Sequence, residues 1–271
     1  MIVLPIALTS MLILGPEPST ATVPDTLIDV GGHALHLEVR EGAQLLTVVL
    51  EAGGAADASS WAALPDSLAR QTGATIVTYD RAGLGRSDLG PPDLTPEDEV
   101  RDLREALDRL GTPPATIFVA ASYGGMLALL HAALYPDHVV GLVLVDPMNP
   151  VFVRETGDFV QSTVPDMAQP ENDRERVVLR MKRTFGDLTA RTAAIEPGLA
   201  IPMIVLTAGE PWWGSEEIDR AWRRSHEVIA GRSAHRELVV AEGSDHDVPE
   251  DRPDLIVEAV SRILAEIDRR E

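Results

Sequence analysis

The sequence predicts an α/β domain in which a doubly wound, mostly parallel sheet of eight strands is covered by helices. Short β-branched runs alternate with helical patterns along most of the 271 residues, as expected for βαβ units. The runs are almost continuously apolar, which is typical of parallel strands buried on both faces. One long interval without a strand pattern predicts a helical cap inserted between the sixth and seventh strands.

The predicted strands begin with a hairpin and continue as six apolar runs. The segment TLIDVGGHALHLEVREG predicts the hairpin, with its turn at Gly31 and Gly32. The six runs are LTVVLEA (46–52), ATIVTYD (74–80), ATIFVAA (115–121), GLVLVD (141–146), PMIVLTA (202–208) and RELVVAE (236–242).

The clearest helix signal is TPEDEVRDLREALDRLG. Thr95 is a suitable N-cap, Pro96 occupies the first helical position, and Gly111 is a suitable C-terminal stop. Between them, apolar residues recur at helical spacing. Further helices are expected directly after Ser122 and over RPDLIVEAVSRILAEIDRR.

The interval without strands divides the predicted domain. It contains the helical stretch ENDRERVVLRMKRTF, and an excursion of this length is usually functional. We expect residues 147–200 to form a cap over the carboxyl ends of the strands, where α/β sheets bind ligands. Residues 25–146 and 201–271 then form the core.

The N-terminal residues 1–24 read as a signal-like or anchor segment followed by a spacer. The apolar run from Ile2 to Leu14 has the length of a signal-peptide core and is short for a membrane span. No Lys or Arg precedes it. The segment favours an exported or membrane-anchored protein, with a cytoplasmic protein carrying an N-terminal tail as the alternative.

The charge and cysteine content exclude several classes of function. A net charge of −20 argues against nucleic acid or an anionic membrane surface as a partner, so a membrane contact is expected only through an N-terminal anchor. The absence of cysteine excludes disulfides, thiolate nucleophiles and zinc sites with cysteine ligands.

The segment TIFVAASYGGMLALL places a serine at the break between a strand and a helix. A nucleophile elbow of the G-x-S-x-G type needs small residues around such a turn, and here Ala120 replaces the first glycine while Gly124 keeps the second. Ser122 is therefore the candidate nucleophile. The N–H of Tyr123, at the start of the helix, can bind a developing oxyanion. The alternative role of Ser122 is to cap the helix.

Of the seven histidines, His246 is the candidate base. It lies in the loop GSDHDVPED, between the last strand and the last helix, which is the place of a base in the chain order Ser…acid…His. A metal site from Asp245, His246 and Asp247 is disfavoured because consecutive loop residues define no coordination geometry. Surface or packing roles are predicted for the others: His33, His36, His131, His138, His226 and His235.

Together with the elbow, three segments resemble the serine-hydrolase branch of the α/β-hydrolase superfamily, over residues 30–265. They are VVLEAGGAADASSW (48–61), YDRAGLGRSD (79–88) and GLVLVDP (141–147). The resemblance implies that the N–H of Gly54 is a second oxyanion donor, in a loop where Ala52 replaces a common histidine. The pair Gly83 and Gly85 lacks the third glycine of a dinucleotide-binding loop.

The acid that orients the histidine is left open between two strand ends. Asp146 ends the GLVLVD strand, a position that the resemblance favours. Glu210 follows the PMIVLTA strand, but many relatives place their acid where this chain has Trp212. Asp146 is our first candidate and Glu210 the second, followed by Glu216 and Glu217.

The predicted function is cleavage of a small to medium carboxylic ester through an acyl-enzyme, without a metal or cofactor. Met148, Phe152 and Trp212 are candidate pocket residues. The alternatives are a cofactor-free perhydrolase, a serine peptidase, or a non-catalytic ligand-binding homologue on the same fold. The sequence predicts neither the substrate nor the oligomeric state.

Overall fold

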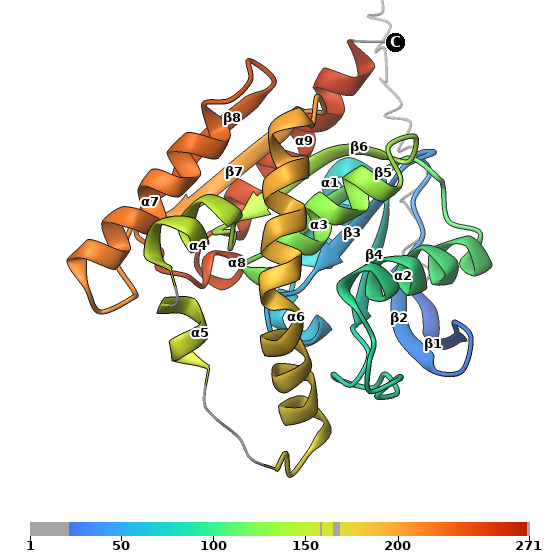
Figure 1. Cartoon of the computed structure of the whole chain (residues 1–271). Helices are drawn as coiled ribbons and strands as arrows, with labels where there is room; N and C mark the ends of the chain where they lie inside the picture. The colour runs from blue at the N-terminus through green and yellow to red at the C-terminus, as the bar shows by residue number, and fades with distance from the viewer. Residues whose placement is uncertain (1–21, 158, 165–168, 270–271) are drawn as a thin grey trace, which may run out of the picture.

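The chain forms one eight-stranded sheet with helices on both faces (Figure 1). This computed structural model describes residues 22–157, 159–164 and 169–269. The predicted signal-like segment lies outside the described residues except for its last three, which begin the first strand. Among the helices that the structure describes, none is both long and apolar enough to cross a membrane.

The strands follow the spatial order β1-β2-β4-β3-β5-β6-β7-β8. β1 and β2 form the predicted hairpin, β2 runs antiparallel to β4, and the remaining neighbours are parallel. The predicted strands are confirmed nearly to the residue, although β6 begins two residues earlier than its apolar run. Their bounds are β1 Thr22–Asp29, β2 Ala34–Arg40, β3 Thr47–Glu51, β4 Thr75–Asp80, β5 Thr116–Ala121, β6 Val139–Val145, β7 Met203–Ala208 and β8 Arg236–Ala241.

The helices alternate with the strands as the sequence pattern predicts. In α2, Thr95 and Asp98 form a reciprocal capping box and Gly111 ends the helix with φ 68°, so the predicted start and stop signals both act as expected. The helices are α1 Leu64–Thr72, α2 Pro96–Leu110, α3 Tyr123–Leu134, α4 Pro150–Thr156, α5 Phe159–Thr163, α6 Asp173–Ile195, α7 Glu216–Ala230, α8 Val248–Asp251 and α9 Pro253–Asp268, with the short 3₁₀ helices η1 Ala58–Trp61 and η2 Glu196–Gly198.

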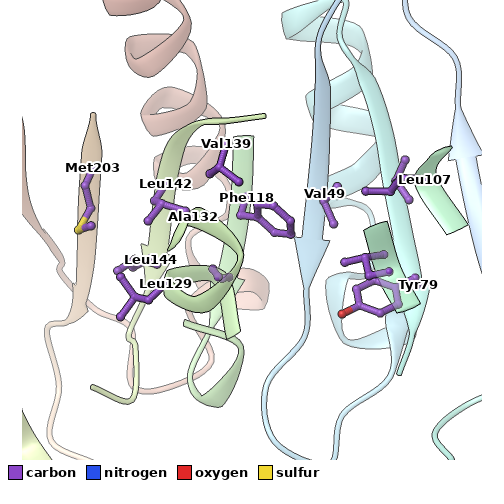
Figure 2. Packing of buried hydrophobic residues seen from close by; sticks show 14 of the residues in the cluster. Val49, Tyr79, Leu107, Phe118, Leu129, Ala132, Val139, Leu142, Leu144 and Met203 are labelled. Carbon is purple, nitrogen blue, oxygen red and sulfur yellow. The ribbon is translucent and has the colours of Figure 1, made fainter. Parts of the chain in front are cut away.

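Successive strand residues pack into two different core layers. Val49 and Phe118 belong to the layer that contains Leu107 of α2 and Leu129 of α3 (Figure 2), whereas their neighbours Val48 and Ile117 belong to the layer with α1 and α9. This alternation follows from the two-residue period of a strand. Because both faces are covered, the carboxyl ends of the strands are left to carry the polar groups.

A helical insertion separates β6 from β7 and contains α4, α5, α6 and η2, as the sequence predicts. The long α6 crosses in front of α3 in Figure 1. Buried Arg180 of α6 fixes it to the core by donating to the carbonyl of Ala82 at 2.7 Å and pairing with Glu99 at 3.1 Å. Whether residues 147–200 behave as a separate unit stays a prediction.

Candidate active site

Ser122 occupies the sharp turn between β5 and α3. Its backbone adopts φ 49° and ψ −122°, a conformation that side-chain-bearing residues rarely hold. A Cβ on Gly124 would lie 2.6 Å from the carbonyl oxygens of Glu51 and Ala52, so no larger residue fits there. Ala120 lies within the extended part of β5, where a methyl group is accommodated. The turn therefore has the geometry of a nucleophile elbow.

Asp146 and His246 form a hydrogen bond at the carboxyl ends of β6 and β8. His246 Nδ1 donates to Asp146 Oδ2 at 2.6 Å, although the residues are 100 positions apart in the sequence. The other carboxylate oxygen, Oδ1, accepts the backbone N–H of Ala208 and the indole N–H of Trp222, each at 2.9 Å. Asp146 is fully buried.

The surroundings of Asp146 keep its carboxylate ionised. Burial acts to raise its pKa, but the hydrogen bond from His246, the nearby histidine rings and the Ala208 N–H outweigh burial. The net result is a pKa below the usual range of an aspartate.

The other candidate acids lie elsewhere. Glu210 is exposed, and its backbone N–H donates to the carbonyl of Ser244 at 3.0 Å. Glu216 and Glu217 are exposed in the first turn of α7. Of the acids considered from sequence, the structure thus brings Asp146 to His246.

Two tryptophans and a second histidine surround the Asp146–His246 pair. The Trp212 ring stacks on the His246 ring, with centroids 4.0 Å apart and planes 17° apart. His226 is fully buried, bonds Thr207 Oγ1 and the carbonyl of Pro147, and lies 3.8 Å from Asp146. Burial lowers the pKa of His226, so a neutral ring is expected there.

The loop after β3, which carries Gly53 and Gly54, lies next to Ser122 and is supported by a buried arginine. A Cβ on Gly53 would lie 3.4 Å from Ser122 Cβ, which shows how close the loop is to the serine. The Arg81 guanidinium donates to the carbonyls of Ala52, Gly53 and Gly54. Tyr123 begins α3, so its N–H has no acceptor within the helix.

Two cavities meet at Ser122. The wider one, about 420 Å³, is lined by Ser122, His246 and the Gly53–Gly54 loop, and its lining also includes charged Arg174, Asp245 and Asp247. The smaller one, about 180 Å³, extends from Ser122 under the helical insertion. Its polar lining residues are Ser122, Tyr123, Gln161 and Lys182, and the remaining walls are Gly54 and the apolar side chains of Met148, Val160, Val164, Val178, Met181 and Phe185.

The predicted pocket residues separate into two groups. Met148 lines the smaller cavity. Phe152 instead is fully buried and packs edge-on against Trp222, with ring centroids 4.7 Å apart, because α4 turns it toward the core. Trp212 likewise lines neither cavity and stacks on His246 instead. An apolar pattern in the sequence does not distinguish pocket walls from core.

Sequence reasoning missed Trp222, Arg81 and the nearness of His226. Trp222 and His226 are spaced by four residues, which puts them on one face of α7, and that face is buried. Arg81 directly follows a strand end within the YDRAGLGRSD segment. The helical spacing and the position after a strand were the available signals, and neither tells which residue the side chain contacts.

The fold and the site define a class of protein. Residues 48–259 match the model of the alpha/beta hydrolase family, and the chain belongs to this family. It is 26% identical over 231 residues to the uncharacterized protein YqjL of Bacillus subtilis, covering 84% of this chain and 87% of that protein. A shorter match is 36% identical over 102 residues to the lipase LipV of Mycobacterium tuberculosis, covering 36% and 38%.

Solved structures of hydrolases share the same fold. A proline iminopeptidase from Mycobacterium smegmatis superposes with a TM-score of 0.65 at 18% identity, covering 91% of this chain and 99% of that one. An esterase from Exiguobacterium antarcticum superposes with a TM-score of 0.63 at 18% identity, covering 88% and 99%. At this identity the similarity establishes the fold, while the chemistry depends on the residues of this chain.

Proposed function

We propose that this alpha/beta hydrolase is a serine hydrolase that cleaves carboxylic esters through an acyl-enzyme. The proposal depends chiefly on the buried hydrogen bond between Asp146 and His246, whose ring lines the same cavity as Ser122. Because Nδ1 of His246 donates to the carboxylate, Nε2 is the ring nitrogen that can accept a proton. The lipase among the sequence relatives and the esterase among the structural neighbours are consistent with ester chemistry.

In the proposed reaction, Ser122 attacks the ester carbonyl while His246 removes its proton. His246 then gives this proton to the departing alcohol, which leaves the acyl group on Ser122. A water molecule attacks this acyl-enzyme while His246 removes its proton, and His246 returns the proton to Ser122 as the acid is released. Asp146 keeps the ring oriented and stabilises its charged form. The N–H groups of Gly54 and Tyr123 stabilise the oxyanion of each tetrahedral intermediate.

The two cavities provide separate sites for the two parts of the ester, the acyl chain and the alcohol. The smaller, apolar cavity suits the acyl chain, since burying methylene groups there is favourable. The wider cavity suits the alcohol, which must leave and be replaced by water.

Labelling with a fluorophosphonate, together with turnover of p-nitrophenyl butyrate, tests the proposal. Labelling should disappear in Ser122→Ala, and turnover should fall by about 10⁴-fold or more in Ser122→Ala and His246→Ala. Asp146→Asn should lose most activity, whereas Glu210→Gln should keep it. Absence of labelling in the folded wild-type protein would refute the serine mechanism.

The same panel separates ester cleavage from the peptidase alternative. A p-nitroanilide of an amino acid reports amide cleavage, and the match of 36% identity over 90 residues to a proline iminopeptidase of Lactiplantibacillus plantarum makes the proline derivative the natural choice. Faster turnover of this amide than of butyrate would replace the esterase proposal by a peptidase.

A further inference from the structure

Trp212 covers one face of the His246 ring. The two rings lie almost parallel, so the π face of the indole is turned toward the whole imidazole. His246 Nδ1, on the ring edge, remains bonded to Asp146. Trp212 therefore contacts the histidine without competing for either of its nitrogen atoms.

The Trp212 ring is itself fixed from several sides. Its backbone N–H and that of Trp213 both donate to Asp219 Oδ1 at 3.0 Å, which anchors the loop to α7. Its ring stacks on Trp213 with centroids 4.1 Å apart and meets Trp222 edge-on at 5.5 Å and 87°. A ring held in this way can hold another ring in place.

Trp222 acts on the other member of the pair. Its indole N–H donates to Asp146 Oδ1, on the carboxylate oxygen that His246 does not use. Trp222 is buried in α7 and packs edge-on against Phe152, so the N–H keeps its direction. A buried carboxylate needs every such donor, and here Trp222 and Ala208 together turn Oδ2 toward His246.

We propose that Trp212 and Trp222 are positioning residues for the Asp146–His246 pair and form an aromatic clamp around it. The inference builds on the proposed function. Trp212 fixes the plane of the His246 ring and stabilises the imidazolium that forms in each half-reaction, since a π face attracts a cation above it. Trp222 fixes the carboxylate that accepts from this ring. Neither tryptophan is among the residues that line the two cavities at Ser122.

The first test separates the ring face from simple packing. Trp212→Leu should lower kcat about tenfold with little change in KM, while Trp212→Phe, which restores a π face, should recover most of the loss. Phe159→Leu removes a ring that packs on Trp213 at the edge of the same cluster, and it should retain most of kcat. Equal losses of kcat in Trp212→Leu and Phe159→Leu, or no rescue by phenylalanine, would overturn the role of Trp212.

The second test does not depend on turnover and so separates the clamp from the proposed chemistry. The proton between His246 Nδ1 and Asp146 should give a low-field ¹H NMR resonance in the wild-type protein, identified by its loss in His246→Ala. Trp222→Phe keeps an aromatic ring, although a smaller one, but removes the N–H, and should shift or broaden this resonance and lower kcat about tenfold. An unchanged resonance in folded Trp222→Phe would overturn the role of Trp222. A normal resonance with no fluorophosphonate labelling would instead refute the hydrolase mechanism and leave the clamp as a structural finding.

Discussion

Arg81 Nη1 lies 2.7 Å from Glu51 Oε1, and both side chains are buried at the carboxyl ends of adjacent strands. The hydroxyl of Tyr79 donates to the other carboxylate oxygen of Glu51. Burial acts against the charge of Arg81, but the Glu51 carboxylate outweighs this and raises the Arg81 pKa. The guanidinium is thus a permanent cation with its remaining donors directed at the carbonyls of the Gly53–Gly54 loop.

Arg81→Lys should weaken this support while keeping the charge opposite Glu51. A lysine has a single ammonium in place of the planar fork, so it cannot reach the Glu51 carboxylate and several loop carbonyls together. With the Gly54 N–H less well placed for the oxyanion, kcat should fall about 10- to 100-fold with a small change in KM. Steady-state kinetics measures both.

The matched control for this substitution is Arg183→Lys. Arg183 is exposed on α6 and donates to the carbonyl of Pro92. It should leave kcat unchanged. If Arg81→Lys behaves like this control, the loop does not depend on the arginine.

Gly124→Ala should disrupt the elbow, because the added methyl group would enter the space of two backbone carbonyls. Backbone atoms cannot rotate away as a flexible side chain can, so we expect a loss of about 1–3 kcal/mol in the free energy of unfolding. Ester turnover should fall as Ser122 shifts. Urea denaturation and fluorophosphonate labelling report these two effects.

Gly186→Ala, within a helix, should have the opposite effect on stability from Gly124→Ala. Gly186 is exposed within α6 and an added Cβ meets no atom within 4 Å. The substitution should raise the free energy of unfolding by about 0.5–1 kcal/mol, because alanine loses less backbone entropy in a helix. Equal effects of the two glycine substitutions would show that the Gly124 position is not constrained.

Local features of the site were predictable from sequence, and long-range ones were not. The elbow and the His246 loop are each defined by a strand and the helix after it, so neighbouring residues were sufficient to identify Ser122 and His246 as candidates. The donor from Trp222 to Asp146 joins positions 76 residues apart and depends on how α7 packs. No periodicity of the sequence carries that information.

The insertion shows the same limit. Its helical character and its place between β6 and β7 followed from the missing strand pattern and from ENDRERVVLRMKRTF. Phe152 and Met148 were equivalent on the sequence, because each is an apolar residue of the same segment. Only packing separates them, with Phe152 in the aromatic core and Met148 on a cavity wall.

The buried His131 side chain should make the free energy of unfolding decrease in mild acid. Burial lowers the pKa of His131 to about 3, with a smaller effect from Arg104, while in the unfolded chain it returns to about 6.5. Its stabilising effect is complete above pH 6.5 and is lost as the pH falls toward 3, because the unfolded state then binds the extra proton. Between pH 7 and pH 5 the loss amounts to about 2 kcal/mol.

His131→Leu removes this titration, so its free energy of unfolding should fall less than that of the wild type between pH 7 and pH 5. Urea denaturation at the two pH values measures the difference. His138→Leu is the control, since His138 is only partly buried whereas His131 is fully enclosed. The same acid sensitivity in wild type and His131→Leu would contradict the assignment.

The smaller cavity should limit the length of the acyl chain. Its volume of about 180 Å³ corresponds to about six groups of the size of a water molecule, so turnover should be highest for chains of about four to eight carbons. Each methylene that still fits should raise kcat/KM by about three- to fourfold.

Val178→Phe should move the optimum to shorter chains and Phe185→Ala to longer ones, because both residues line this cavity. Arg174→Gln changes a residue that lines the wider cavity and should leave the optimum in place. A p-nitrophenyl ester series from acetate to laurate measures these shifts, and an optimum that follows Arg174 but neither Val178 nor Phe185 would place the acyl chain in the wider cavity instead.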